Sequence, residues 1–213
     1  MEIRVSKLIR LWIAELFVKA RSNKGLEVVA EEYLEELIDR SLIFVGRRRA
    51  NGRIRTCRIH DLLRQLGIRE AQIENVVHVI NENVPILSEA INYQRRVMVP
   101  LRKHVYLPRH GSGVTSTTRS LVFTGFSYSR DTVPADRPCF TFSHFKLLTV
   151  LDVLATHHCF SSVISQLVHL RYVAAKIDKA PSLYSLRNLQ TIILDTLGTR
   201  HLELPLEIWT MSE

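Results

Sequence analysis

The sequence predicts an α+β chain built of two different parts. The first part shows two amphipathic helix patterns, a hairpin signal and the start of a third helix, in the order of a winged helix with a β-hairpin wing. In the last third, one pattern of leucines occurs three times, which is typical of a short leucine-rich-repeat solenoid with parallel β-strands. We therefore expect a winged helix at 1–74, a connecting segment at 75–118 and the first repeats at 119–213.

The two helices predicted at the start carry apolar side chains at steps of three and four, which places them on one helix face. The first helix is expected over 5–20, with Leu16 near the end of its stripe. A polar break at 22–25 separates it from the second helix, whose stripe runs from Leu26 to Ile38. Glutamates on the outer face of the second helix lie toward its start, where the helix dipole favours acids.

A hairpin is predicted after the second helix. Two β-prone runs, 42–45 and 54–59, flank the turn signal Asn51-Gly52. The third helix opens directly after the hairpin with Leu62. The wing is basic and has no acid among its arginines, which are Arg47, Arg48, Arg49, Arg53, Arg55 and Arg58.

The repeated pattern has the form LxxLxxLxL and begins at Phe145, Leu167 and Leu186. The starts lie 22 and then 19 residues apart, close to the usual period of about 20–29 residues. Each unit is expected to place one short strand beside the next, because no unit buries its apolar side alone. A fourth unit is indicated near Leu204. The alternative is a set of ordinary leucine-rich helices.

The composition is that of a folded, water-soluble protein, with 46% hydrophobic and 23% charged residues. No apolar run approaches the roughly 20 residues that cross a bilayer. Three scattered cysteines without metal-ligand spacing indicate reduced thiols and a cytoplasmic protein. No nucleophile motif such as GxSxG occurs, so neither a catalytic nor a metal site is expected.

Several motifs together resemble the plant intracellular disease-resistance receptors of the coiled-coil, nucleotide-binding, leucine-rich-repeat type, as found in solanaceous plants. They occur in the order of that family over nearly the whole chain: KLIRLWIAELF, EEYLEELIDRSLI, CRIHDLL, LLTVLDV, LVHLRYV, LRNLQTIIL and ELPLEIWTM. The resemblance implies defence signalling in the cytoplasm, protein partners bound through the repeats, and intramolecular contact between the repeats and a nucleotide-binding module. ADP or ATP is the ligand in the parent family.

The tripeptide Ile59-His60-Asp61 stands where the family has Met-His-Asp. The resemblance implies that His60 and Asp61 are cofactor-binding residues: His60 would approach the phosphate of ADP, and Asp61 would support the turn. A helix start suits a phosphate because it presents free amides and a partial positive charge, and an adjacent Asp can cap those amides. The simpler interpretation is that Asp61 only caps the helix and His60 is a surface residue. Leu16 departs from the family, which usually has Gly at this position.

No GxxxxGK(S/T) phosphate loop occurs in the 213 residues. Phosphoryl transfer depends mostly on positioning by that loop and its metal ion. We therefore expect a piece of a receptor that is not an enzyme and that binds ADP or ATP weakly or not detectably by itself.

The competing interpretation is a winged-helix DNA-binding protein, because a basic wing can lie along phosphates. The net charge of +8 favours polyanions in general. However, the second helix stands where a recognition helix would be, and its acidic outer face would repel the DNA backbone. Nucleic acid is therefore not the partner we expect.

Overall fold

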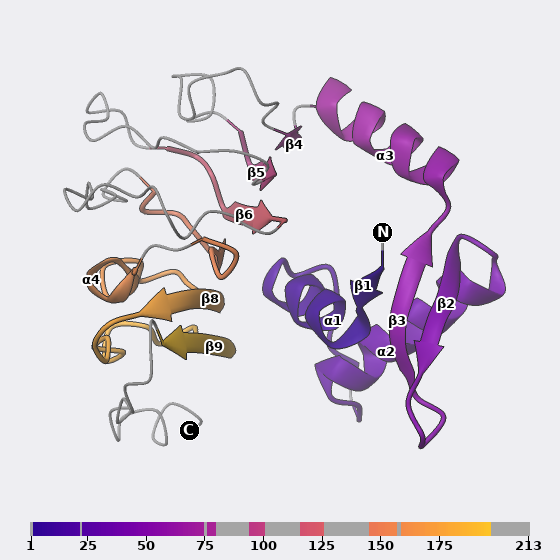
Figure 1. The fold of residues 1–213 in the computed structure, drawn as a ribbon, viewed down its shortest axis with the longest axis horizontal. Helices are drawn as coiled ribbons and strands as arrows, with labels where there is room; N and C mark the ends of the chain where they lie inside the picture. Colours follow the sequence, from indigo (N-terminus) through magenta and orange to yellow (C-terminus); the bar gives the residue numbers. More distant parts are fainter. Residues whose placement is uncertain are drawn as a thin grey trace, which may run out of the picture. The chain divides into compact units, whose positions relative to one another are not determined.

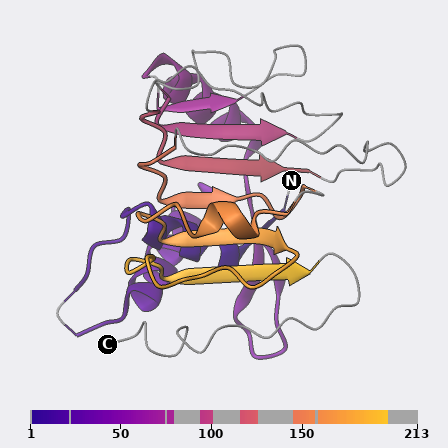
Figure 2. The same ribbon diagram turned by 90° about the vertical axis from the view of Figure 1, so that its left-hand side faces the viewer.

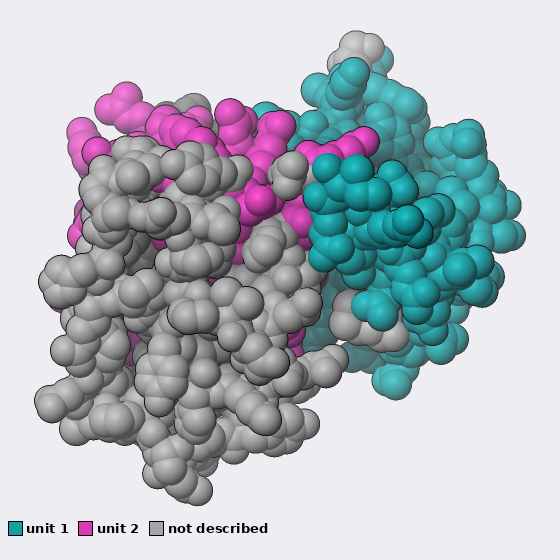
Figure 3. Space-filling view, turned by 90° about the horizontal axis from the view of Figure 1, so that it is seen from above, with its two compact units in different colours: residues 1–73 teal, residues 74–213 magenta. Residues whose placement is uncertain are grey.

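The computed structural model describes residues 2–21, 23–74, 76–79, 94–100, 116–125, 145–156 and 159–196. The chain divides into two compact units, residues 1–73 and residues 74–213 (Figure 3). None of the described helices is both long and apolar enough to cross a membrane.

Unit 1, residues 1–73, contains a small antiparallel sheet with the first two helices packed against it (Figure 1). Its elements are β1 (Ile3–Arg4), α1 (Val5–Ala14), α2 (Leu26–Asp39), β2 (Ile43–Arg48), β3 (Ile54–Ile59) and α3 (Asp61–Ile73). The strand order is β1-β3-β2, so β1 extends the β2–β3 hairpin on one side. The predicted order of helix, helix, hairpin and helix is confirmed. Strand β1 was not predicted, because two residues are too few to show an alternating pattern.

One cluster of buried side chains joins α1, α2 and the sheet of unit 1. It consists of Val5, Ile9, Ile13, Val18, Val29, Ala30, Leu34 and Cys57. The residues from α1 and α2 are those of the predicted apolar stripes, because steps of three and four bring side chains onto one helix face. These stripes therefore hold the sheet, and with it the wing and the start of α3, in place.

The first helix is shorter than predicted, and its expected end at residue 20 is wrong. Leu16 has a φ of 62°, which lies in the left-handed region. The amide of Leu16 donates to the carbonyl of Ile13 at 3.0 Å. The amide of Phe17 donates to the carbonyl of Trp12, also at 3.0 Å. This is the Schellman ending of a helix, whose left-handed position is usually glycine, so Leu16 occupies that position with strain.

The tip of the wing is a tight turn that fixes the hairpin register. The amide of Gly52 donates to the carbonyl of Arg49 at 3.0 Å, and the amide of Arg49 donates to the carbonyl of Arg53 at 2.8 Å. Gly52 has a φ of 79°, which a residue without a Cβ adopts readily. The amide of Arg53 also donates to Oδ1 of Asn51 at 3.2 Å. The hairpin predicted from Asn-Gly is confirmed.

Unit 2, residues 74–213, contains a six-stranded parallel sheet (Figure 2). Its strands are β4 (Val77–Val79), β5 (Arg96–Pro100), β6 (Ser120–Thr124), β7 (Val150–Asp152), β8 (Tyr172–Ile177) and β9 (Thr191–Thr196). They lie in the sheet in the order in which they occur in the chain. The short helix α4 (Ser161–Ile164) lies between β7 and β8 in sequence. The predicted parallel strands are confirmed at all three copies of the leucine pattern.

Equivalent positions of the three copies lie side by side in the sheet. Leu151 is the register partner of Val173, and Val173 is the partner of Ile192. These three residues occupy the third apolar position of each copy. Together with the leading leucines they belong to one hydrophobic cluster, in which Ile192 is partly buried. Ordinary helices at these three segments are therefore excluded.

The parallel sheet begins earlier than the predicted repeat boundary at residue 119. β4 and β5 lie within 75–118, the segment that we expected to be a connection. β5 pairs with β6 along its whole length. The turn of β5 lacks the leucine pattern because Gln94 stands where the second leucine would be, and Thr118 stands at the equivalent position before β6. Thr118 is nevertheless fully buried, and its hydroxyl accepts a hydrogen bond from Oγ of Ser116 at 2.8 Å.

The residue before each strand has the same backbone role in successive turns of the chain. The carbonyl of this residue accepts two consecutive amides from the start of the next strand, at 2.7–3.2 Å. The accepting residues are Arg95, Arg119, Thr149 and Arg171. Because the bonds involve only backbone atoms, they allow different side chains and different lengths of chain between strands. The fourth repeat predicted near Leu204 lies outside the described residues.

Replacing Leu16 by glycine is expected to raise the free energy of unfolding of unit 1 by roughly 0.5–1 kcal/mol. Glycine removes the steric cost of the left-handed conformation, about 1–2 kcal/mol, but it loses more conformational entropy on folding than leucine does. Leu16 is 62% exposed, so little apolar burial is lost. Urea unfolding followed through the amide signals of α1 measures the change.

Leu66→Gly is the matched control, because Leu66 is 53% exposed but lies inside helix α3. Glycine there is expected to destabilise the helix by about 1 kcal/mol. A loss of stability in Leu16→Gly comparable to that of the control would contradict the strain assigned to residue 16.

Candidate functional site

His60 lies at the junction between β3 and α3 and caps the helix. Its carbonyl accepts the amide of Arg64 at 2.9 Å, which is the first hydrogen bond of the helical turn. Its Nδ1 accepts the amide of Leu62 at 3.2 Å. A side chain that accepts an amide from the first helical turn has the role of an N-cap. The histidine therefore helps to define where α3 begins.

This hydrogen bond assigns the protonation of the imidazole. Nδ1 of His60 can accept the Leu62 amide only if it carries no proton. In the neutral ring the proton is then on Nε2, which is a hydrogen-bond donor. The junction thus offers one imidazole N–H donor at the positive end of a helix, where anions are favoured.

A second contact to the imidazole comes from the neighbouring strand. The ring of Phe44, in β2, lies with its centroid 6.2 Å from that of His60, and the ring planes are inclined by 55°. This is within the range in which tilted aromatic rings attract each other. Phe44 is the register partner of Arg58 in β3. Opposite residues of antiparallel strands share one face, so Phe44 and Arg58 lie on the same face of the hairpin.

Asp61 is the first residue of α3, and its carboxylate is not the group that accepts the capping hydrogen bond from the Leu62 amide. In the first turn of α3, the amide of Leu62 donates to the side chain of His60 and not to that of Asp61. Oδ1 of Asp61 lies 3.9 Å from Nε of Arg64, and the Asp61 side chain is 84% exposed. An exposed ion pair at this distance stabilises little. Asp61 contributes mainly its negative charge at the start of the helix.

The arginines of the wing are mostly without acidic partners. Nε of Arg47 lies 3.6 Å from Oε2 of Glu2, and Nη1 of Arg48 donates to the carbonyl of Gly52 at 2.9 Å. The described residues provide no ion pair to the other four, which are Arg49, Arg53, Arg55 and Arg58. The wing therefore presents a concentrated positive charge to solvent.

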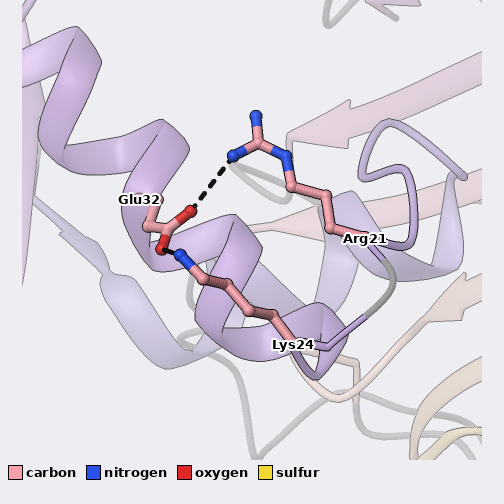
Figure 4. A network of polar contacts seen from close by, with 3 residues as sticks. All are labelled: Arg21, Lys24 and Glu32. Atoms are coloured by element: carbon pink, nitrogen blue, oxygen red, sulfur yellow. Dashed lines mark hydrogen bonds and ion pairs between the residues drawn. The ribbon is translucent and has the colours of Figure 1, made fainter.

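The acidic face of α2 is partly neutralised from within unit 1. Glu32 accepts a hydrogen bond from Lys24 and pairs with Arg21, whose Nη1 lies 3.3 Å from Oε2 (Figure 4). The hydrogen bond from Lys24 lowers the pKa of the Glu32 carboxyl below its usual value. Desolvation opposes this change in pKa, while the charges of Lys24 and Arg21 add to it. The network ties the loop between α1 and α2 to the outer side of α2.

The described part of the chain contains neither a candidate metal site nor a disulfide. It holds no group of three or more His, Cys, Asp and Glu side chains that could bind a metal ion. Cys57 and Cys159 are free thiols, and burial raises the pKa of the Cys57 thiol. Cys139 lies outside the described residues. The candidate site is therefore the His60 junction with its aromatic neighbour and the basic wing.

The first part of the chain matches a known family. The family described as the winged helix domain of disease resistance proteins matches residues 1–67, from the start of the chain into α3. Residues 1–67 are therefore similar to this winged helix domain. The match includes the hairpin and the His60 junction, so the site described above lies within the part that the family shares.

Similar proteins from one plant extend the likeness over nearly the whole chain. The late blight resistance protein homolog R1B-16 of Solanum demissum is 34% identical over 98% of the chain. A second late blight resistance homolog of this plant is 34% identical over 99%, and the homolog R1B-14 is 33% identical over 98%. The chain covers only 16–17% of the length of these relatives. The resemblance to plant disease-resistance proteins is thereby confirmed.

The cap of α3 can be tested by comparing His60→Ala with Asp61→Asn. His60→Ala is expected to speed hydrogen exchange of the first amides of α3 about fivefold, the effect of losing a cap of about 1 kcal/mol. Asp61→Asn is expected to change these rates less than about twofold, because it loses only an exposed ion pair. NMR-detected exchange measures both variants. If Asp61→Asn had the larger effect, the capping role assigned to His60 would be wrong.

Proposed function

We propose that this chain is part of a plant intracellular immune receptor that acts in disease-resistance signalling. In this proposal the winged helix reports the nucleotide state of the receptor, and the parallel sheet is the start of a leucine-rich-repeat solenoid that binds proteins. The observation that carries the proposal is the imidazole of His60 at the start of α3, whose Nδ1 accepts the Leu62 amide. Its support comes from the match to the winged helix domain of disease resistance proteins and from the relatives in Solanum demissum.

The residues of the junction fit a phosphate group of ADP or ATP. Nε2 of His60 supplies a neutral donor, and the start of α3 supplies backbone amides and a partial positive charge. A bound nucleotide would supply the anionic phosphate that such donors recognise. A ligand that binds one receptor state better than another shifts the receptor toward that state. Contact of His60 with ADP would in this way favour the inactive state.

The chain by itself contributes donors to such a site but no phosphate loop. The sequence has no GxxxxGK(S/T), and the relatives are about six times longer than the segment they share with this chain. We infer that this segment does not catalyse phosphoryl transfer and that it acts by binding within a larger cytoplasmic receptor. Affinity for ADP is expected only in the millimolar range, because the remaining contacts to the nucleotide are missing.

The repeat region is proposed to bind proteins rather than small molecules. Successive leucines and strand residues are buried, which leaves the positions between them to determine what is bound. Exposed polar residues at such positions are Lys146, His169, Arg187, Asn188 and Gln190. Their mixture of charge and hydrogen-bonding groups suits a polar protein surface.

Titration of the labelled 213-residue chain with ADP tests the nucleotide proposal. NMR signals of the His60 ring and of the first amides of α3 are expected to shift, with an affinity in the millimolar range. His60→Ala is expected to abolish the shifts of the α3 amides. His169→Ala, which changes an exposed histidine of unit 2, is the matched control and is expected to leave them unchanged.

Two results would contradict this proposal. One is an unchanged set of ADP-induced shifts in His60→Ala, which would place the nucleotide elsewhere. The other is micromolar affinity of the unaltered chain, which would mean that these residues form a complete site without a phosphate loop.

A second candidate function is contact of the wing with the phosphates of double-stranded DNA. The observation that favours it is the group of five wing arginines that have no ion pair among the described residues: Arg48, Arg49, Arg53, Arg55 and Arg58. A two-stranded ribbon fits the major groove, and guanidinium groups pair well with phosphate. The acids of α2 disfavour the usual docking of a recognition helix, so this contact would involve the wing alone.

The salt dependence of binding to a 20-base-pair duplex distinguishes this candidate. Each phosphate contact adds about 0.9 to the slope of log affinity against log salt concentration. A triple variant, Arg49→Gln, Arg53→Gln and Arg55→Gln, is therefore expected to reduce the slope by about 2–3. The charge-matched control is a triple variant at Arg10, Arg69 and Arg187. Equal losses in both variants would show attraction by net charge alone and would eliminate the wing as a DNA contact.

A further inference from the structure

We propose that Phe44 is a positioning residue for His60, which keeps the imidazole bonded to the Leu62 amide and thereby keeps Nε2 protonated for a phosphate. The inference rests on the proposed function for the meaning of Nε2, but its structural content can be tested without any nucleotide. Phe44 lies outside the Ile-His-Asp motif, yet in this inference it determines the orientation of the motif's imidazole.

The contacts of His60 show why a positioning residue is needed. Its backbone is fixed by the bond from the Arg64 amide, but its exposed ring is held within its own chain segment only by the Leu62 amide at 3.2 Å. A rotation of the ring by half a turn exchanges Nδ1 with a carbon atom and breaks that bond. Exposed side chains gain rotamer entropy by such motion. A single hydrogen bond between partly solvated groups is a weak restraint against it.

Phe44 supplies the restraint from a different element. Its ring lies 6.2 Å from the imidazole, centroid to centroid, and β2 is held beside β3 by the hairpin register. The ring therefore limits the space through which the imidazole can rotate. Phe44 belongs to β2, whose position is set by its pairing with β3. The position of Phe44 therefore does not depend on the cap of α3 that it stabilises.

Phe44 has little role in the core of unit 1, so its effect can be isolated. It is 44% exposed and does not belong to the buried cluster, whereas its neighbour Ile43 packs against that cluster. Neighbouring residues of a strand point to opposite faces, so the phenyl ring lies on the side away from α1 and α2. A large apolar side chain on an exposed face beside a histidine fits a local role better than a role in overall stability.

The test measures the hydrogen bond directly in the full 213-residue chain. NMR detects a coupling across the bond between the amide nitrogen of Leu62 and Nδ1 of His60, under alkaline conditions in which histidine side chains are neutral. We expect the coupling in the unaltered chain and its loss in Phe44→Ala and Phe44→Leu. Exchange of the Leu62 amide is expected to become at least about threefold faster in both variants, the scale of one lost aromatic contact. Phe44→Tyr, which keeps the ring, is expected to retain both properties.

Phe17→Ala is the control, because Phe17 is a comparably exposed phenylalanine of unit 1, at 53%. It is expected to leave the coupling and the Leu62 exchange rate unchanged. Phe44→Leu retains apolar volume, so the test remains decisive should Phe44→Ala unfold. Absence of the coupling in the unaltered chain, or its persistence in a folded Phe44→Leu variant, overturns the inference.

Failure of this inference and failure of the proposed function give different results. If Phe44 controls the coupling but ADP does not shift the His60 signals, the positioning role stands and the nucleotide contact fails. If ADP shifts these signals equally in the unaltered chain and in Phe44→Leu, the nucleotide contact stands and the positioning role fails.

Discussion

A strand of three to six residues cannot bury its own apolar side, and this constraint organises the larger unit of the chain. Each strand from β5 to β9 lies beside its predecessor, with Leu121, Leu151, Val173 and Ile192 in one row. Repeated carbonyls before the strands fix the offset from one turn to the next. In β9 the residue of this row, Ile192, is only partly buried. The side chains at several positions between the leucines, such as Lys146, His169 and Arg187, are exposed.

The sequence predicts the fold best where burial repeats. Three copies of the leucine pattern located β7, β8 and β9, and the apolar stripes located α1 and α2. β5 was missed as a repeat strand because its turn places Gln94 at a leucine position. β6 lies within the predicted repeat region, although the buried Thr118 stands at its leucine position. At β5 and β6 the feature shared with the other repeats is the backbone hydrogen bonding before the strand, not the leucine at this position. The end of α1 was missed for a different reason: a left-handed conformation at Leu16 leaves no trace in hydrophobic spacing.

The sequence located the start of the third helix but did not predict which side chain caps it. The motif Ile59-His60-Asp61 pointed to the helix start, and His60 does lie there. The cap was expected from Asp61, yet the imidazole is the group that accepts the amide, while the carboxylate lies near Arg64. The contact between Phe44 and His60 joins β2 to the end of β3. It follows from the register of the hairpin, which the sequence pattern does not specify. Side-chain roles at a junction depend on a few rotamers, which sequence patterns do not encode.

The most direct test of the stacked-strand account is the pattern of methyl contacts among the repeated residues in solution. Neighbouring parallel strands are about 4.8 Å apart, so strong nuclear Overhauser effects are expected from Leu151 to Val173 and from Val173 to Ile192. Direct effects from Leu151 to Ile192 are expected to be weak or absent. Strong effects instead between Leu148 and Leu151, with amide contacts of a helix within each segment and none between segments, would contradict the account.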